Sequence, residues 1–449
     1  FEQEGFRLSG TIHARNRDFT SRIDVGFGKK KRITVNEVPV RTASDLSAVL
    51  NTVFFCPEDL QLIKEGAAAR RRFIDNSLCQ LRPRYAAALA EFSLDLLKET
   101  WKGENALTSP LSVLCALGMT ANGARGGTLE QMEAVLGLPV EELNGLLAAW
   151  AADLPREKDC RVELANSVWV RDDGSFEADQ DFLDTAAKWY GAEVFASPFG
   201  DAAVRDINSW VEKNTRGMIP EILDELGDTT VLVLVNALAL EAEWEEIYED
   251  IHVREDAIFT KEDGAAQPAA LMYSSEGYYL KDEGAQGFLK FYKGGRWAFA
   301  ALLPDEGTAL EDYLNSLTGA RLRQVLAGAE ETLVYAAIPK FKSAYGVELN
   351  DALKSLGMTD AFDMGRADLS GLGVSEMGPL FISRVLHKTY ISVDEKGTQA
   401  GAATAVLADS GGTAPGTVPE VYLERPFLYM LVDTETSLPA FIGVVTAME

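Results

Sequence analysis

The first ninety residues show the hydrophobic pattern of a small α+β segment. Two β-rich runs flank the sequence GFGKKK within residues 23–40, and this arrangement predicts a β-hairpin. The run VLNTVFFCPEDLQLI predicts a buried strand, a turn at Cys56 and Pro57, and a helix. The helix is expected to begin at Glu58 and Asp59, because acidic side chains favour the first turn. Alone, these elements indicate only the α+β class.

From Phe92 onward the pattern changes first to helical spacing and later to strands. FSLDLLKET has helical spacing, and Ser109 followed by Pro110 predicts the N-cap and first turn of a second helix. After Leu223 the apolar runs TTVLVLVNALAL, RWAFAALLP and ETLVYAAIPKFK predict strands. The C-terminal part is therefore expected to be an α+β domain with large antiparallel or mixed sheets.

Charge is distributed unevenly along the 449 residues. Residues 1–91 hold 15 Lys or Arg and 11 Asp or Glu, whereas residues 92–449 hold 27 and 58, and the net charge is -27. This asymmetry indicates two sources of sequence. An acidic body repels phosphate backbones, so we expect no nucleic-acid partner for residues 92–449 and a soluble monomer. No apolar run reaches the roughly 20 residues of a membrane helix, so no membrane partner is expected.

Few residues are suited to metal binding or to histidine-based catalysis. The cysteines are too sparse and irregular for a disulfide framework or a zinc site, so we expect buried free thiols and no metal or cofactor. No export signal opens the chain at Phe1, which leaves the compartment open. The residues concerned are Cys56, Cys79, Cys115, Cys160, His13, His252 and His387.

The N-terminal part contains three informative segments, RITVNEVPV, FFCPEDLQLIKEGAAARRRFID and CQLRPRYAAAL. In this order they resemble RecF, a bacterial recombination ATPase that binds DNA. An ATPase of that class needs a G-x-x-x-x-G-K-[ST] phosphate loop, and the sequence contains none. The run at Arg70, Arg71 and Arg72 is better interpreted as a solvated face than as a phosphate site. We therefore expect residues 1–91 to be a RecF-like fragment without ATPase activity, joined to the rest within residues 85–92.

Residues 92–449 contain a second set of motifs, which are SPLSV, NSVWV, INSWVEKNTRGMIPEIL, NALALEAEW, IPKF, ADLSGL, HKTYISVDEKGTQAGAATA and ERPFLYMLVDTETSLPAFIGVV, in this order. Their order and spacing resemble the serpin family of serine protease inhibitors. The resemblance implies the serpin fold, in which helices pack around large β-sheets and a reactive-centre loop is exposed. It also implies that this part is a single-use inhibitor and not an enzyme that turns over.

The segment EKGTQAGAATA, from Glu395, is nearly free of bulky side chains. By itself it would be interpreted as a flexible Ala/Gly linker, but the flanking motifs favour the serpin hinge, which becomes an internal strand after the loop is cleaved. Gly397 supplies the conformational freedom at the start of the hinge. A hinge without charge or proline favours insertion and an inhibitory member. The buried face would hold Thr398, Ala400, Ala402 and Thr404, and the other face Gln399, Gly401, Ala403 and Ala405.

The cleaved bond is placed by counting the family's usual hinge length from Glu395. This places the acyl-side residue at Gly411 or, one residue shorter, at Ser410, followed by Gly412 or Gly411. The small side chains of LADSGGTAP suit a shallow specificity pocket of elastase or subtilisin type. Asp409 leaves an acid-preferring protease as a minor option. The expected partner is a serine protease held in a covalent acyl complex.

Other positions correspond to control points of the family. Four polar residues form the predicted shutter cluster behind the sheet, where a hydrogen-bonded network would gate insertion. Three more form the predicted breach site where insertion begins, with an ion pair between Lys340 and Glu395 that is worth about 0 to 1 kcal/mol. The shutter cluster is Ser109, Ser112, Asn236 and His387, and the breach site is Trp244, Lys340 and Glu395.

Three functions of different classes follow from these resemblances. An inhibitory serpin predicts a covalent protease complex, a non-inhibitory serpin predicts simple loop cleavage, and a RecF-type ATP-dependent DNA-binding repair protein predicts nucleotide binding. The permissive hinge favours the first, although Gln399 and Gly401 depart from the family's commoner residues and keep the second open. The missing phosphate loop and the acidic body oppose the third. The serpin resemblance also implies action outside the cell.

Overall fold

The computed structural model describes residues 5–13, 18–26, 32–35, 38–40, 82–152, 154–398 and 418–448. The chain forms two compact units, and the boundary between them lies between Tyr85 and Ala86. Helix α4 (Arg82–Thr100) contains this division and begins before Phe92, where helical spacing is first apparent in the sequence. Residues 86–91 therefore belong to the second compact unit, although the sequence places the boundary after residue 91.

The described part of the first unit is a four-stranded antiparallel sheet. Strand β1 (Gly5–His13) pairs with β2 (Asp18–Gly26), β2 with β3 (Arg32–Val35), and β3 with β4 (Val38–Val40). The pairing of β2 with β3 confirms the predicted hairpin. The strand, turn and helix predicted within residues 49–63 lie outside the described residues. The resemblance to RecF stays a prediction.

The second unit contains two large sheets, which confirms the expected α+β class. In the larger sheet the strand order is β19-β14-β11-β12-β13-β20-β21-β5, and β10 pairs with β11. All neighbours are antiparallel except β14 and β19. Its strands are β5 (Ala106–Thr108), β10 (Val253–Thr260), β11 (Ala266–Asp282), β12 (Ala285–Phe291), β13 (Trp297–Pro304), β14 (Glu330–Pro339), β19 (Glu420–Tyr422), β20 (Phe427–Asp433) and β21 (Leu438–Val445).

The second sheet is mixed and has the order β15-β17-β18-β9-β6-β8. Only β6 and β8 run parallel. Strand β9 is mostly apolar apart from Asn236 and two glutamates, and it is buried on both faces over most of its length, as expected for a strand covered by helices on two sides. The strands are β6 (Cys160–Arg171), β8 (Glu193–Ser197), β9 (Leu232–Glu243), β15 (Phe341–Glu348), β17 (Leu386–Asp394) and β18 (Gly397–Thr398).

Helices cover both sheets, and a short pair of strands, β7 (Phe176–Ala178) and β16 (Gly373–Ser375), completes the unit. The predicted cap of the central helix is present, because Ser109 Oγ accepts a hydrogen bond from the Ser112 N–H and Pro110 occupies the first turn. The helices are α5 (Pro110–Asn122), α6 (Gly126–Leu136), α7 (Val140–Ala152), α8 (Gln180–Tyr190), α9 (Asp201–Asn214), α10 (Leu310–Ser316), α11 (Gly319–Ala327) and α12 (Asn350–Ser355), with 3₁₀ turns η2 (Asp250–His252) and η3 (Asp360–Phe362).

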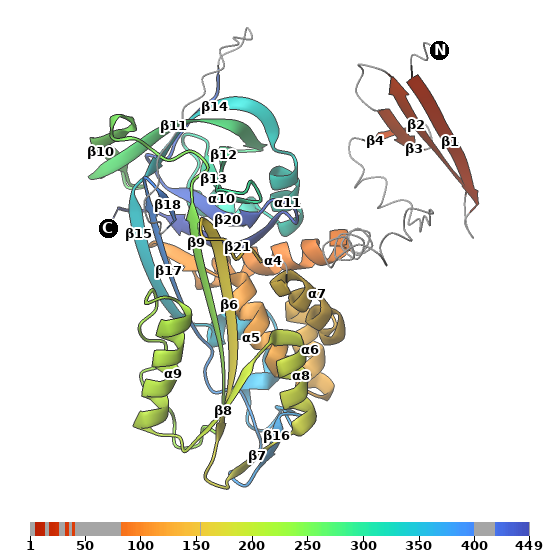
Figure 1. Cartoon of the computed structure of the whole chain (residues 1–449), viewed down its shortest axis with the longest axis vertical. Helices are drawn as coiled ribbons and strands as arrows, with labels where there is room; N and C mark the ends of the chain where they lie inside the picture. Colours follow the sequence, from red (N-terminus) through yellow and green to blue (C-terminus); the bar gives the residue numbers. More distant parts are fainter. Residues whose placement is uncertain are drawn as a thin grey trace. The chain divides into compact units, whose positions relative to one another are not determined.

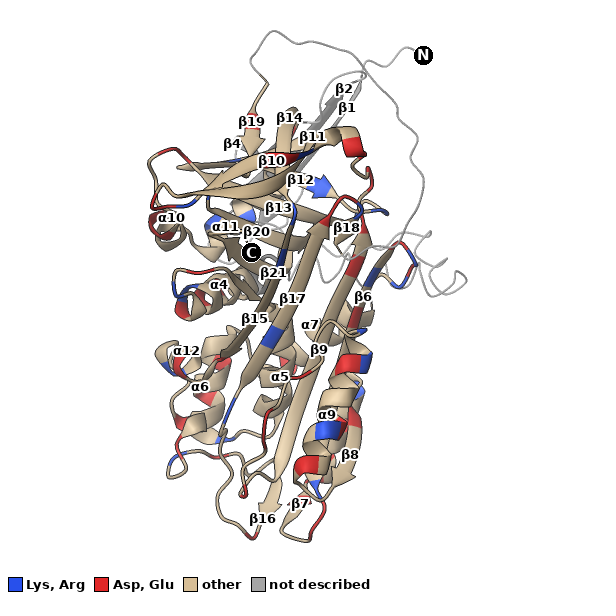
Figure 2. Ribbon diagram, turned by 90° about the vertical axis from the view of Figure 1, so that its left-hand side faces the viewer, with Lys and Arg blue, Asp and Glu red and all other residues tan. Residues whose placement is uncertain are grey.

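Different helices cover the two faces of the six-stranded sheet. In Figures 1 and 2 the long strands run between α9 on one side and α5 on the other. Trp210 of α9 packs with Trp169 of β6 and Val235 of β9 in one apolar cluster. Helix α5 is buried along nearly its whole length and contacts β9 and β6. The central strands therefore lie between two layers of helix.

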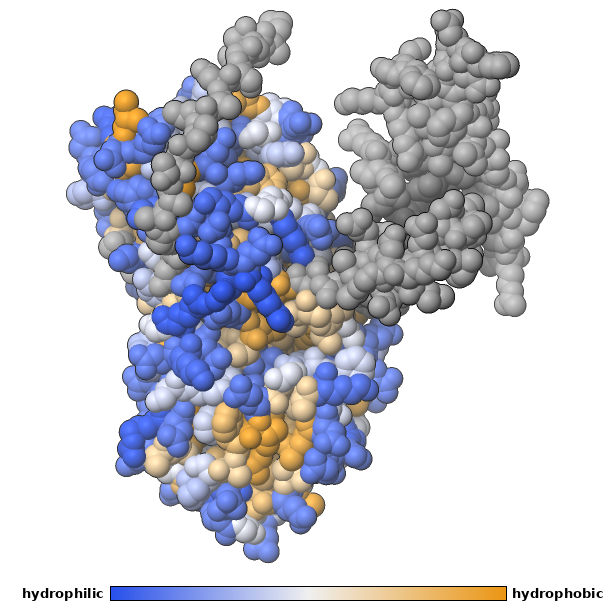
Figure 3. Space-filling model, in the orientation of Figure 1, coloured by the Kyte–Doolittle hydropathy of each residue, from blue (hydrophilic) through white to orange (hydrophobic). Residues whose placement is uncertain are grey.

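The surface of the second unit is mostly hydrophilic in the view of Figure 3, with apolar residues gathered in its lower part. This agrees with the acidic composition of residues 92–449. In the part of the chain that the structure describes, no helix is both long and apolar enough to cross a membrane.

Candidate functional site

The start of the predicted hinge lies inside the six-stranded sheet, because β18 stands between β17 and β9. Gly397 has a φ of 151°, and a Cβ atom there would meet the carbonyl oxygen of Ala242, so this position requires glycine. Asp394 Oδ1 accepts hydrogen bonds from the N–H groups of Lys396 (2.8 Å) and Gly397 (3.3 Å). These bonds fix the turn that directs the hinge into the sheet.

Beyond β18, strands β17 and β9 face each other without a ladder hydrogen bond in the described residues. Strand β18 pairs with only one end of each strand. A sheet edge without a ladder partner is a place where a further strand can pair. The rest of the predicted hinge and the predicted cleavage site lie outside the described residues: Gln399, Ala400, Gly401, Ala402, Ala403, Thr404, Ser410, Gly411 and Gly412.

Thr398 is only 3% exposed and is held by a residue that the sequence analysis did not single out. Its Oγ1 lies 2.6 Å from the hydroxyl oxygen of Tyr292. The Tyr292 ring is fully buried and stacks on Trp244, with ring centroids 4.5 Å apart. In sequence, Tyr292 is one aromatic residue between an apolar strand and a Gly-Gly turn, a pattern that usually indicates core packing. The side chain of Thr398 is therefore buried in the sheet, where it contacts the Tyr292 hydroxyl group.

The three residues of the predicted breach site lie together beneath the hinge. Trp244 is fully buried, and its Nε1–H donates to the carbonyl oxygen of Asp394 at 2.9 Å. The Trp244 N–H donates to the carbonyl oxygen of Lys396, also at 2.9 Å. Trp244 thus contacts both sides of the turn that precedes β18 and holds the end of β17 against the end of β9.

The predicted ion pair is present, and it has a third member. Lys340 Nζ lies 2.5 Å from Glu395 Oε1 and 2.7 Å from Glu255 Oε1. Burial alone would lower the pKa of Lys340, but the two carboxylates outweigh burial and raise it. Burial opposes ionisation of Glu395 as well, but the Lys340 ammonium lowers its pKa overall. The side chains are partly exposed, so the network contributes little to stability.

Three members of the predicted shutter cluster are joined by hydrogen bonds. The Ser109 N–H donates to His387 Nε2 at 3.0 Å, and Ser109 Oγ donates to the Ala440 carbonyl oxygen at 2.9 Å while accepting from Ser112. His387 is 4% exposed, and burial lowers its pKa to about 4. The imidazole is therefore neutral at pH 7, as its role as hydrogen-bond acceptor requires.

The fourth member, Asn236, does not join that group. Its Nδ2 donates to Asn166 Oδ1 at 2.7 Å, because the two asparagines stand opposite each other in the β6–β9 ladder. His387 lies on β17, on the far side of β18 from β9. The Asn236 Oδ1 atom is buried and has no hydrogen-bond partner in the described structure. The shutter cluster is thus two groups and not one network.

Comparison with known proteins identifies the family. The model for "Serpin (serine protease inhibitor)" matches residues 87–448. The chain belongs to the serpin family. The leukocyte elastase inhibitor of Equus caballus is 33% identical to this serpin over 377 residues, which are 80% of this chain and 98% of the relative. An uncharacterized serpin-like protein of Thermococcus kodakarensis is 30% identical over 367 residues, 79% of this chain and 84% of the relative.

Solved structures agree with this assignment. The thermophilic serpin tengpin in its native state is 43% identical, with a TM-score of 0.76 over 81% of this chain and 94% of tengpin. Tengpin in its latent state is 40% identical, with a TM-score of 0.73 over 82% of this chain and 98% of tengpin. The serpin fold expected from the sequence is thereby confirmed for residues 87–448.

A buried ion pair supports the breach site of this serpin from below. Lys290 Nζ lies 2.9 Å from Glu276 Oε1, and the Lys290 side chain is 3% exposed. Its ammonium group lies 4.4 Å from the ring centroid of Tyr248 and 5.4 Å from that of Trp244. Burial would lower the pKa of Lys290, but Tyr248 and Glu276 raise it overall. The cation therefore persists at neutral pH and fixes the Trp244 ring.

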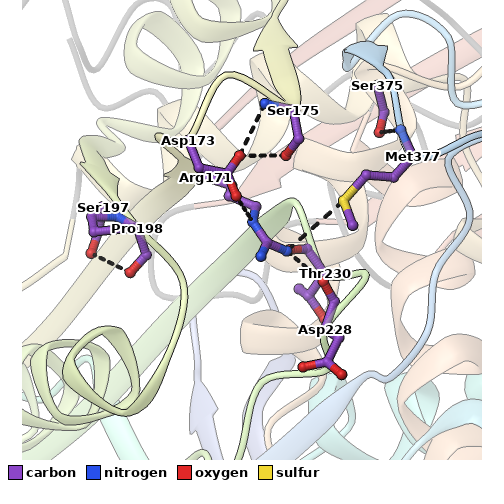
Figure 4. Close-up of polar contacts among 9 residues, drawn as sticks. All are labelled: Arg171, Asp173, Ser175, Ser197, Pro198, Asp228, Thr230, Ser375 and Met377. Atoms are coloured by element: carbon purple, nitrogen blue, oxygen red, sulfur yellow. Dashed lines mark hydrogen bonds and ion pairs between the residues drawn. The ribbon is translucent and has the colours of Figure 1, made fainter.

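The end of β6 that lies far from the hinge carries a different contact (Figure 4). Arg171 Nη1 donates to the carbonyl oxygens of Asp228 (2.6 Å) and Thr230 (3.0 Å), and Nε pairs with Asp173 Oδ2 at 2.6 Å. Asp228 and Thr230 directly precede β9. Arg171 therefore fastens the segment that enters β9 to the end of β6 in this serpin.

The two described cysteines of this serpin, Cys115 and Cys160, are buried and free. Burial raises the pKa of Cys115 to about 12 and that of Cys160 to about 11, so both are protonated and unreactive at neutral pH. Within the described ranges, no three His, Cys, Asp or Glu side chains are grouped so that they could hold a metal ion.

Proposed function

We propose that this serpin inhibits a serine protease as a single-use substrate, by loop cleavage, acyl-enzyme trapping and insertion of the loop between β17 and β9. The observation that carries the proposal is the position of β18. Two hinge residues already pair with both strands, while the remaining facing edges of β17 and β9 share no ladder hydrogen bond in the described residues. An inserted strand would continue β18 along these edges.

The chemical step is ordinary acyl transfer up to the ester. The protease serine Oγ attacks the carbonyl carbon of Gly411 or Ser410 and the peptide C–N bond breaks. The released amino group of Gly412 or Gly411 takes the proton that the serine gave up, and the acyl half stays bound as an ester. Insertion of the loop then displaces the protease before water hydrolyses the ester. The free energy of the new strand pairing opposes withdrawal of the loop and so keeps the protease trapped.

The residues of the hinge favour fast insertion. Between Gly397 and Leu407 the sequence contains no charge and no proline. An inward charge would be costly to bury, and proline would remove a ladder donor. Thr398 is already buried against Tyr292, so the first step of insertion needs no further desolvation of this side chain.

Small residues around the proposed bond favour an elastase-like or subtilisin-like target. LADSGGTAP has no Lys or Arg for a trypsin-like pocket. The relative named leukocyte elastase inhibitor, 33% identical, supports the same class of target.

The direct test mixes this serpin with neutrophil elastase and with subtilisin and resolves the products by denaturing electrophoresis and mass spectrometry. We expect a band at the summed mass of protease and serpin, less the released C-terminal peptide, which begins at Gly412 or Gly411. Protease whose active-site serine is already blocked is the control and should give no such band. Cleaved loop with fully active protease in every case would instead establish a non-inhibitory serpin.

We further propose that residues 1–91 are a RecF-like fragment without ATPase activity, joined to the serpin within residues 85–92. Support comes from the quoted motifs, the missing phosphate loop and the change of charge. Long-read sequencing of the source locus in independent isolates tests the fusion. A single uninterrupted frame in all of them would support a natural fusion, and separate frames would contradict it.

A further inference from the structure

A series of buried and partly buried hydrogen bonds leads from the middle of β9 to the helices beneath the sheet. Asn236 of β9 donates to Asn166 of β6 at 2.7 Å, and Asn166 Nδ2 donates to the Tyr190 carbonyl oxygen at 2.8 Å. The Tyr190 hydroxyl donates to Asn144 Oδ1 at 2.6 Å. Asn144 and Asn122 exchange two amide hydrogen bonds, at 2.8 and 2.9 Å. The chain crosses β9, β6, α8, α7 and α5.

The link between Tyr190 and Asn144 is buried. Asn144 is 4% exposed and Tyr190 is 8% exposed. Burial raises the pKa of Tyr190, so the phenol keeps the proton that it donates. A Cβ atom added at Gly118 of α5 would lie 2.5 Å from the Tyr190 hydroxyl oxygen. The hydroxyl therefore fits against α5 only because residue 118 is glycine.

The two sides of the gap between β17 and β9 are fastened to different places. The β17 side is held by His387 to the Ser109 N–H and by Thr389 Oγ1 to the Leu107 carbonyl oxygen at 2.8 Å. The β9 side packs directly on α5, and it is also joined to α7 through β6 and α8 by the Tyr190–Asn144 bond. Widening the gap requires one side to move relative to α5. The β17 bonds end on backbone atoms, whereas the Tyr190–Asn144 bond joins two side chains, so the β9 side is the easier to move.

We infer that the Tyr190–Asn144 hydrogen bond is a positioning contact that keeps the β9–β6–β8 side of the sheet in place over α5 and thereby slows loop insertion. The inference rests on the proposed insertion function and assigns one step of it to a named contact. Tyr190 and Asn144 do not touch the protease or the inserted loop in this account. They act by setting the barrier to widening of the gap.

The substitution Tyr190→Phe isolates this contact. It removes the hydroxyl and keeps the ring, and Asn144 Oδ1 still accepts from Asn122 Nδ2, so no buried acceptor is orphaned. The matched control is Tyr313→Phe, which removes another buried phenol bond, from Tyr313 to Asp282 Oδ2 at 2.9 Å, on α10 and away from the six-stranded sheet. Gly118→Ala is a second variant that displaces the same Tyr190 hydroxyl from the opposite side.

The readout is uptake of the synthetic peptide TQAGAATAVLADSG, which copies residues 398–411, by the intact full-length chain. Uptake is followed as the rate of appearance of a species with raised thermal stability. We expect Tyr190→Phe and Gly118→Ala to take up the peptide several-fold and up to about tenfold faster than the parent, since one hydrogen bond is worth about a factor of ten. Tyr313→Phe is expected to unfold at lower denaturant concentration with an unchanged uptake rate.

Two results would overturn the inference in distinguishable ways. In the first, Tyr190→Phe takes up the peptide no faster than the parent or Tyr313→Phe, while the parent still forms its covalent protease complex. This result would contradict the role of Tyr190 but not the inhibitory function. In the second, the parent chain takes up no peptide and forms no protease complex. This result would contradict both the role of Tyr190 and the inhibitory function. Should Tyr190→Phe fail to fold, the Gly118→Ala rate decides in the same way.

Discussion

The two strands that border the gap, β17 and β9, are anchored by chemically different contacts. On β17, His387 and Thr389 bond to the backbone of Ser109 and Leu107. On β9, Asn236 begins a series of bonds that includes the Tyr190 carbonyl oxygen and then depends on the side-chain pair Tyr190–Asn144. Backbone partners have fixed positions, whereas side chains can rotate to new partners. The sheet therefore has a fixed side, β17, and a releasable side, β9 with β6 and β8, and both are attached to the region of α5.

The largest expected effect comes from blocking the gap itself with Thr398→Arg. The Thr398 side chain is buried between the two sides and bonds to Tyr292, so an arginine there must either bury an unpaired charge or keep the hinge out of the sheet. A penalty of about 3 kcal/mol would lower the yield of covalent complex about 100-fold.

Gel densitometry against elastase measures this yield, and Thr398→Ser is the matched control that keeps the hydroxyl. Loop cleavage should continue at the parental rate in both variants. A normal yield of complex with Thr398→Arg would show that Thr398 need not lie between β17 and β9.

Acid should weaken the attachment of the fixed side, β17. The pKa of His387 is about 4 in the folded protein, below its ordinary value near 6.5, so the unfolded chain takes up a proton first as the pH falls. The stability contributed by neutral His387 is complete above about pH 6.5 and is lost as the pH falls toward 4, by up to about 3 kcal/mol.

Urea unfolding of the parent and of His387→Gln at pH 7.5 and 4.5 measures this contribution. The loss of unfolding free energy between these two pH values should be larger for the parent by up to about 3 kcal/mol. Equal pH dependence in the two proteins would contradict a buried neutral imidazole on the β17 side.

A smaller effect on the same side is expected from Thr389→Val. This change keeps the shape of the side chain and removes the bond to the Leu107 carbonyl oxygen, which should cost about 1 kcal/mol of unfolding free energy. Peptide uptake should accelerate less than it does in Tyr190→Phe, because His387 still holds β17. Greater acceleration by Thr389→Val would reverse the assignment of the fixed and releasable sides.

The smallest effect is expected at the breach ion pair. Glu395→Gln leaves Lys340 paired with Glu255, and the side chains are partly exposed, so the unfolding free energy should fall by less than about 1 kcal/mol. The difference should shrink further in high salt. Denaturant unfolding at low and high ionic strength measures it, and a loss well above this limit would mean that Glu255 does not substitute for Glu395.

The sequence predicted those parts of the structure that depend on residues close together in the chain or that correspond to motifs of the family. Ser109 and Pro110 could be assigned to a helix start because capping involves residues only a few positions apart. The Lys340–Glu395 pair came from motif correspondence, and Glu255 was missed because its strand, β10, is brought near only by the fold.

Contacts between distant residues could not be predicted in this way. Tyr292 and Thr398 are 106 residues apart, and Tyr190 and Asn144 are 46 apart, so neither bond leaves a periodic signal. Asn236 bonds to Asn166, which the sequence analysis did not single out, because the register of β6 on β9 places Asn166 directly opposite Asn236. Strand register depends on the whole sheet and not on the local pattern.

Hydrogen–deuterium exchange of intact and loop-cleaved serpin tests the central claim most directly. In the intact protein, the facing edges of β17 and β9 share no ladder bonds in the described residues beyond β18, so their edge amides should exchange faster than those of the β6–β9 ladder. After cleavage, an inserted strand should protect the amides of both edges. Unchanged exchange along β17 and β9 after cleavage would contradict insertion between these two strands.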